Sequence, residues 1–326
     1  GDSADSPATL TISGGEISQK DFIAIKNDDF GKLSITGGTF SSDNQAVQNW
    51  SEATISGGKF LKGDIITWSY EGSNSTTEIS GGAVINGDVK AVNYDGGSSV
   101  ASVTITGGTI NGKLVKGTYN GAIVPAKPTA TSSSIQVSGG TFSGISSDEI
   151  SAFVKDGYTT TGSDGSFTIT DATEPTEDSV AETGGIYYKS VQNAINAAEG
   201  GATVTLVRSV NEDIVVSGKE ITLDLGENTL TNVSGDTITV KIDANLTVVG
   251  SGTVDNKSNA RAAIFNEGTV TLNGGTYDRT SESGESADIS GGNSWYTICN
   301  HGSMTIHDGA TVKNTGSFSS MIENGY

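Results

Sequence analysis

Two aspartates, Asp64 and Asp88, come closest to a catalytic or metal-binding pattern. Each follows a glycine and precedes an apolar segment, and Lys113 holds the same place in the next repeat. Carboxylates stacked on neighbouring turns can hold Ca²⁺, and a nearby Lys or Arg can remove a proton α to a substrate carboxylate. However, residues 1–171 contain no Arg, and the aspartates do not extend to a third repeat. We therefore interpret both as turn residues, name Ca²⁺ as the cofactor this pattern would accept, and nominate no catalytic residue.

Aromatic side chains recur near one corner of successive repeats: Trp50, Trp68, Tyr70, Tyr94 and Tyr119. Aromatic faces spaced along a repeat structure can stack on sugar rings, and an acidic surface does not oppose a neutral glycan. Trp68 and Tyr94 align with Asn49 in the repeat, where ring stacking between neighbouring turns is ordinary packing. Two interpretations stay open here, a carbohydrate-binding platform and internal packing.

Cys299, His301 and His307 are the candidate ligands for a soft metal. Their spacing does not match a zinc pattern, so we expect no metal site there. Cys299 aligns with Phe265 and Glu323 in the repeat and is predicted to be exposed. Paired carboxylates of a glycoside hydrolase cannot be singled out, because 38 acidic residues allow many pairs.

The elements that position these residues are organised by a six-residue box: an aliphatic residue, a polar residue, two glycines, a free position and an apolar residue. It reads ISGGEI, ITGGTF, ISGGKF, ISGGAV, ITGGTI, VSGGTF and LNGGTY, from Ile12, Ile35, Ile55, Ile79, Ile105, Val137 and Leu272. The first six copies start 23, 20, 24, 26 and 32 residues apart. This spacing predicts a solenoid with one coil per repeat.

Each box predicts a strand, a corner and a second strand, with the glycines at the corner for positive φ or close approach to the next coil. A third strand recurs between boxes, where alternation points one set of residues into the core: Ile25, Val47, Ile66, Val92 and Val115. The residues that follow them are polar and are predicted to face water: Lys26, Gln48, Thr67, Asn93 and Lys116. Asparagines at one position predict a partial ladder: Asn27, Asn49, Asn266, Asn300 and Asn324.

The chain is predicted to hold two arrays. Residues 1–171 form the first, closed by a short helix after Ser147 and a hairpin over 158–170. Residues 172–180 are acidic, contain Pro and are expected to be a linker. Residues 181–326 form the second, opened by an amphipathic helix capped by Ser190. Because the second array stops in mid-coil, we expect the chain to hold the back of one helix–coils–cap module and the front of the next.

Composition limits the function classes. The net charge of −20 disfavours nucleic acid and anionic membrane as partners. No stretch of 18 apolar residues is present, so we expect no membrane insertion within this chain. A lone cysteine excludes an intrachain disulfide, which suits a cytoplasmic protein or a bacterial surface protein that makes little use of disulfides.

The boxes, the SVQNAINAAEGGATVTLVRSV opening of the second array and the AFVKDGY closure of the first resemble right-handed parallel β-helix modules of bacterial cell-surface proteins. The resemblance covers nearly the whole chain and implies an all-β, right-handed parallel β-helix in two tandem segments with short capping helices. It also implies an extracellular, adhesin-like or spacer role, with host or dietary glycans or host surface proteins as partners. The wider pectate-lyase-like superfamily also includes lyases and hydrolases, so the alternative is a polysaccharide-binding or polysaccharide-cleaving protein.

Overall fold

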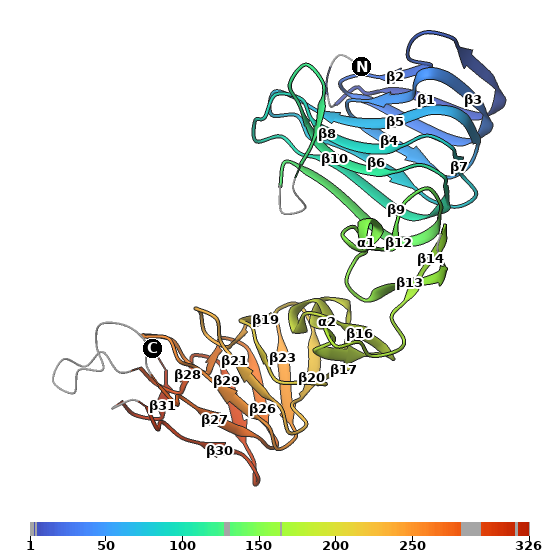
Figure 1. Cartoon of the computed structure of the whole chain (residues 1–326). Helices are drawn as coiled ribbons and strands as arrows, with labels where there is room; N and C mark the ends of the chain where they lie inside the picture. Colours follow the sequence, from blue (N-terminus) through green and yellow to red (C-terminus); the bar gives the residue numbers. More distant parts are fainter. Residues whose placement is uncertain are drawn as a thin grey trace. The chain divides into compact units, whose positions relative to one another are not determined.

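The expected all-β fold of stacked parallel coils is confirmed. The computed structural model describes residues 3, 5–126, 131–163, 165–281, 295–316 and 319–325. Strands hold 54% of the residues and helices 4%, in a β-solenoid of about 12 turns. The chain divides into two compact units, unit 1 (Gly1–Asp171) and unit 2 (Ala172–Tyr326). Figure 1 shows the strands of each unit stacked side by side.

Unit 1 is a stack of three-sided coils. Its strands are β1 (Ala8–Gln19), β2 (Ile25–Asn27), β3 (Gly31–Asn49), β4 (Glu52–Ile55), β5 (Lys59–Ser69), β6 (Ser75–Ile79), β7 (Val84–Ile85), β8 (Val89–Asn93), β9 (Ala101–Ile110), β10 (Leu114–Tyr119), β11 (Ile123–Pro125) and β12 (Ser133–Phe142). These strands pair in parallel from coil to coil, except β11, which turns back on β10. Aliphatic residues that open the boxes are buried in the core, and Phe40 stacks on Phe60 at 4.6 Å between ring centroids.

The glycine corners work as the sequence predicts. In the box at Ile35, Gly38 has φ +102°, and a Cβ added to Gly37 would lie 2.5 Å from the Ser13 carbonyl oxygen of the preceding coil. In the next box, a Cβ on Gly57 would lie 2.2 Å from the Thr36 carbonyl oxygen. Neighbouring coils can therefore stack closely only where these corners lack a side chain.

A cap closes unit 1, as expected. The N-cap of helix α1 (Ser147–Ser151) is Ser146, one residue before the predicted N-cap Ser147, and Ser146 forms a capping box with Glu149. The hairpin of β13 (Tyr158–Ser163) and β14 (Ser166–Asp171) pairs antiparallel with β12 through Thr168 and Thr141. Asp164, at the expected turn, lies outside the described residues.

Unit 2 opens with the hairpin of β15 (Ala181–Thr183) and β16 (Ile186–Tyr188) and with helix α2 (Val191–Ala197). Ser190 caps α2, and Val191, Ala194 and Ile195 are buried against the first coil, as the amphipathic pattern predicts. The Glu212 carboxylate accepts hydrogen bonds from the backbone N–H groups of Val191 and Gln192. At the other end of the helix, Lys219 donates to three carbonyl groups, those of Ile195, Asn196 and Ala198. The negative charge of Glu212 at the N-terminus and the positive charge of Lys219 at the C-terminus both interact favourably with the helix dipole.

The coils of unit 2 form three parallel sheets. The first continues with β17 (Thr203–Leu206), β20 (Glu220–Asp224), β23 (Asn245–Val249), β26 (Thr269–Leu272) and β29 (Ser303–Ile306). The second holds β18 (Val210–Asn211), β21 (Thr229–Thr231), β24 (Thr253–Asp255), β27 (Thr276–Asp278) and β30 (Thr311–Val312). The third holds β19 (Ile214–Val216), β22 (Ile238–Val240), β25 (Ile264–Asn266), β28 (Ile298–Asn300) and β31 (Ile322–Asn324).

Residues 172–180, which we expected to be a linker, belong to unit 2. The Val180 N–H donates to the Tyr188 carbonyl, and the Ala172 carbonyl accepts from the Tyr187 N–H. Both Ala172 and Val180 are buried.

The predicted register of the third face of unit 1 was wrong beyond its second coil. Ile25 and Val47 pair and are buried, but Val47 then pairs with Ile65 in place of Ile66. The cause is an irregularity between Gln45 and Val47, which leaves Ala46 as an extra residue. The inward column therefore continues through Ile65, Val89 and Leu114.

Because of this difference in register, several side chains of the third face lie on the side of the strand opposite to the predicted one. Ile66 and Val92 belong to a separate small cluster outside the main core, and Val115 is half-buried beside a pocket. Thr67 and Asn93, predicted to face water, are buried. Asn93 bonds the Ser99 carbonyl, and the hydroxyl groups of Thr67 and Thr77 lie 2.6 Å apart.

Candidate functional site

Asp64 and Asp88 lie on successive coils, as predicted, and the side chain of Lys90 forms an ion pair with both. Asp64 accepts a hydrogen bond from the Asp88 N–H, and Asp88 accepts one from the Lys113 N–H, so the two carboxylates link successive coils. The Lys90 ammonium lies 2.6 Å from Asp64 Oδ2 and 3.3 Å from Asp88 Oδ2. Lys90 thus fills the position that a cation would take between these carboxylates.

The electrostatics of Lys90 agree with this geometry. Burial works to lower its pKa, but the hydrogen bond and charge of Asp64, with the charge of Asp88, outweigh burial and raise it. Its side chain is 18% exposed, so this ion pair is partly shielded from water. Sequence reasoning missed Lys90 and considered Lys113, whose side chain is exposed. The signal that could have found Lys90 is its place two residues after Asp88, at the start of the strand that follows this aspartate, because residues two apart in extended chain lie on the same face.

The predicted aromatic residues come together as an aromatic cluster of Trp50, Trp68, Tyr70, Tyr94 and Tyr119. Trp50 stacks on Trp68 at 5.5 Å and Tyr94 on Tyr119 at 4.8 Å, and the two pairs meet edge to face. The position of Asn49 is taken in the next coils by Thr67 and Ala91, so the predicted alignment of Trp68 and Tyr94 with Asn49 was wrong. The rings extend outward from the third face and cover Ile66 and Val92.

The members of this cluster differ in their exposure to solvent. Trp68 is 5% exposed and cannot present a ring face to a ligand, whereas Tyr70 and Tyr94 are 39% and 38% exposed. Trp50 and Tyr119 are half-buried. The cluster is therefore mostly an outer packing layer, and its accessible part is a pair of tyrosines that meet at 5.4 Å.

The soft-metal candidates do not form a site. Within the described ranges, no group of three or more His, Cys, Asp or Glu is arranged to hold a metal ion. His301 lies 3.4 Å from Glu323 and packs its ring edge-on to Phe265, while His307 is exposed.

The prediction that Cys299 is exposed was wrong, since its exposed fraction is 0%. Burial and the neighbouring Glu323 raise the pKa of its thiol to about 12, so the thiol stays protonated and unreactive at neutral pH. Its strand neighbours in the ladder, Phe265 and Glu323, are both half-buried, so this outward position is itself covered.

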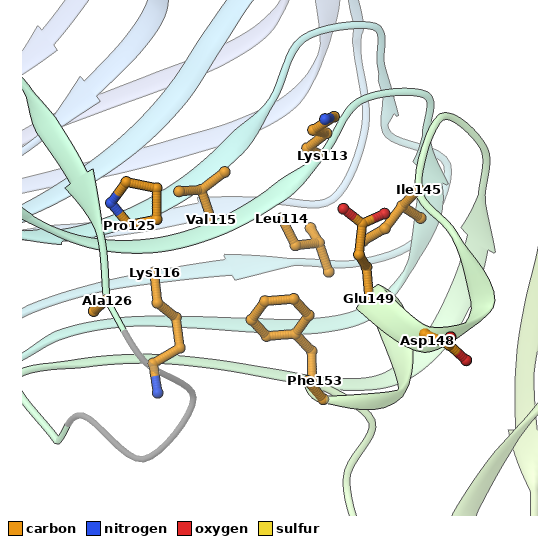
Figure 2. Close-up of a pocket in the computed structure, with 11 residues that line it drawn as sticks. Lys113, Leu114, Val115, Lys116, Pro125, Ala126, Ile145, Asp148, Glu149 and Phe153 are labelled. Atoms are coloured by element: carbon orange, nitrogen blue, oxygen red, sulfur yellow. The ribbon is translucent and has the colours of Figure 1, made fainter.

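An apolar pocket of about 520 Å³ lies at the last coil of unit 1, between β10 and α1. In Figure 2, Leu114 and Phe153 lie at its centre, between Lys116 and Glu149. Hydrogen bonds from Ser146 hold the pKa of Glu149 below its usual value, and burial lowers that of Lys116. The sequence did not indicate this pocket, because it forms where the cap leaves part of the third face uncovered.

No protein-family model matches the sequence, and neither a curated protein nor a solved structure is significantly similar to it. Nor does any helix in the described part of the chain have the length and apolar character needed to cross a membrane.

Proposed function

We propose that this chain is a non-catalytic module of a bacterial surface protein, placed outside the cell, that acts as a rigid spacer or adhesin-like contact surface. The sequence resemblance supports this role, and a solenoid of stacked coils suits it because such a fold is stiff and displays long side faces.

The observation that carries the proposal is that the carboxylates which could act in catalysis are bonded to side chains of the chain itself, mostly on the neighbouring coil. Asp64 and Asp88 bind Lys90, while Asp255 and Asp278 accept hydrogen bonds from Thr280 and Thr315. These contacts stabilise the stack and leave the carboxylates poorly placed to act on a substrate.

Immunolabelling of the producing cells tests the placement. An antibody raised against this chain should label intact cells as strongly as permeabilised cells. Labelling that appears only after permeabilisation would overturn the extracellular assignment, and an antibody against a cytoplasmic protein provides the control for intact envelopes.

Glycan contact is the second candidate function, and the exposed tyrosine pair favours it. Tyr70 and Tyr94 present accessible ring surface next to the half-buried Trp50. On a glycan array, Tyr70→Ala and Tyr94→Ala should each reduce binding, since each removes an accessible ring face on which a sugar ring can stack. Phe22→Ala is the matched control, because Phe22 is an exposed aromatic residue of the same unit that lies outside the cluster. If the wild-type chain binds no glycan, this candidate is excluded.

Polysaccharide cleavage is less well supported, because Lys90 occupies the place between Asp64 and Asp88 that Ca²⁺ would need. With polyuronides and Ca²⁺, we expect no absorbance from an unsaturated product. Clear turnover that disappears in Asp64→Asn would reverse this conclusion.

A further inference from the structure

A turn of tyrosine, polar residue and glycine follows the third face in three successive coils of unit 1. It reads Tyr-Glu-Gly from Tyr70, Tyr-Asp-Gly from Tyr94 and Tyr-Asn-Gly from Tyr119. Strands β5, β8 and β10 end at or just before these tyrosines and pair in a register that aligns them from coil to coil. In all three turns the glycine has positive φ, between +70° and +83°. The acidic residues of the first two turns, Glu71 and Asp95, are exposed.

The two carboxylates lie beside the tyrosine rings. The Glu71 N–H donates to Asp95 Oδ2 at 3.0 Å, which brings the acidic residues of neighbouring coils together. The hydrogen bond and charge of Glu71 raise the pKa of the Tyr70 hydroxyl, and the charge of Asp95 adds to this effect. Backbone hydrogen bonds from Gly97 and Glu71 hold the pKa of the Asp95 carboxyl below its usual value, so this group is ionised at neutral pH. Negative charge is therefore held next to exposed ring surface.

No basic side chain of the described residues forms an ion pair with Glu71 or Asp95. The contrast with Asp64 and Asp88 is direct, because those two carboxylates share the ammonium group of Lys90. Two exposed charges of the same sign on neighbouring coils attract a cation from solution. The carboxylates beside the tyrosines are thus complementary to a positively charged ligand.

The rings add a second requirement on that ligand. Tyr70 and Tyr94 are 39% and 38% exposed and meet edge to face, with 5.4 Å between ring centroids and an interplanar angle of 82°. An exposed ring face packs against a flat apolar surface and also attracts a cation electrostatically. A ligand that joins a ring-stacking body to a positive charge would therefore use both the rings and the carboxylates.

We propose that the tyrosine–acid surface, formed by Tyr70, Glu71, Tyr94 and Asp95, binds glycans that carry protonated amino groups. Sugar rings would lie against the tyrosines, and the ammonium groups would lie at the carboxylates. The proposal rests on the glycan contact proposed above and specifies its ligand class. An acidic glycan is disfavoured by the same carboxylates and by the net charge of −20. A lysine-rich peptide offers the charge but lacks the flat ring, and ordering its long side chains costs entropy.

Titration calorimetry with chitosan and chitin oligomers of equal length tests this proposal. Each sugar of the first carries a free amino group, and each sugar of the second carries a neutral acetamide at the same position. Slightly below neutral pH, where the amino groups are protonated, the wild-type chain should bind the chitosan oligomer about tenfold more tightly. This preference should decrease as salt is added, because the carboxylates are exposed.

Substitutions separate the contribution of charge from that of ring stacking. Glu71→Gln and Asp95→Asn should each weaken binding of the chitosan oligomer about threefold and leave binding of the chitin oligomer unchanged. Tyr70→Ala should weaken binding of both oligomers, since both stack on its ring. Glu78→Gln removes an exposed carboxylate on β6 of the same unit and should change neither affinity.

The outcomes distinguish this proposal from the glycan contact on which it rests. If the wild-type chain binds neither oligomer, the glycan contact is absent and the proposal is wrong as well. If both oligomers bind equally, the glycan contact stands and the preference for amino sugars is overturned. An oligolysine of the same charge that binds as tightly as the chitosan oligomer, and equally well to Tyr70→Ala, would overturn the assignment to a glycan.

Discussion

Buried asparagine amides hold the corners of the coils together. Asn49 is fully buried; its Nδ2 group donates to the Ser51 and Thr76 carbonyls and to Thr77 Oγ1, and its Oδ1 accepts from Asn27. One side chain thus ties its own corner to the coil before it and to the coil after it. Burial without water makes these partners obligatory.

We predict that Asn49→Ala lowers the free energy of unfolding of unit 1 by about 2 to 3 kcal/mol, because several buried partners lose their hydrogen bonds together. Urea unfolding followed by circular dichroism measures the change. Asn44→Ala, at an exposed position of the same strand, should change stability by less than about 0.5 kcal/mol. Equal effects of the two substitutions would show that the ladder contributes nothing specific.

Lys90 provides the counter-charge for the carboxylates of Asp64 and Asp88. We predict that Lys90→Met destabilises unit 1 by about 1 to 3 kcal/mol at neutral pH, because two partly buried carboxylates lose their counter-charge. Lys62→Met removes an exposed ion pair of similar length, 2.7 Å to Asp43, and should cost less than about 1 kcal/mol. Chemical unfolding of both variants makes the comparison.

The pH dependence follows from the raised pKa of Lys90. Because the folded pKa exceeds the unfolded one, the stabilisation by Lys90 is fully present below the unfolded value of about 10.5 and is lost as pH rises through the folded value. Ca²⁺ should raise the unfolding midpoint of Lys90→Met more than that of the wild type, and an equal response would contradict the assigned role of Lys90.

At the scale of elements, the glycine corner is what allows coils to stack. We predict that Gly57→Ala destabilises unit 1 by more than about 3 kcal/mol, because the added Cβ would lie 2.2 Å from the Thr36 carbonyl oxygen and the coils would have to separate. Gly82→Ala, with no atom within 4 Å of its added Cβ, is the control and should be close to neutral. Thermal unfolding measured by circular dichroism distinguishes the two.

Features that depend on local pattern could be predicted from the sequence. The boxes, the Ser190 cap, the hairpin after Gly157 and the asparagine ladder each depend on residues a few positions apart or on a strict repeat. The register of the third face could not be predicted, because Ala46 is an extra residue and because Lys90, two residues before Val92, is the residue that pairs with Ile66. The outward aromatic cluster follows from that shift, since it places Trp68 outside the core.

In the candidate site, too, only the features that follow from the repeat could be predicted. Stacking of Asp64 on Asp88 follows from the repeat and was predicted. The contact of Lys90 with Asp64 also depends on which residue of the next coil lies beside Asp64, and the repeat did not fix that register, so the role of Lys90 was missed. The pocket at Leu114 and Phe153 depends on how a cap of irregular shape meets the last coil, for which the sequence contains no periodic signal.

At the scale of the whole molecule, each unit has its own core. The core of unit 1 is drawn from residues between Ile12 and Ile169, and the core of unit 2 from residues between Val180 and Ile298. Within each core the coils contact mainly their neighbours, so stability is close to a sum of coil and interface contributions. Cooperative unfolding should therefore extend along a unit and end at its boundary.

We predict that the chain unfolds in two transitions, one for each unit. Residues 1–171 and 172–326, produced separately, should each fold and unfold with the midpoint that the corresponding transition has in the whole chain. Gly57→Ala should move only the transition of unit 1, whereas Asn266→Ala, at a fully buried ladder position of unit 2, should move only the other. Scanning calorimetry of the whole chain and of the two fragments measures this. If both substitutions shift one shared transition equally, the two cores unfold as one cooperative body and the division at Asp171 has no thermodynamic meaning.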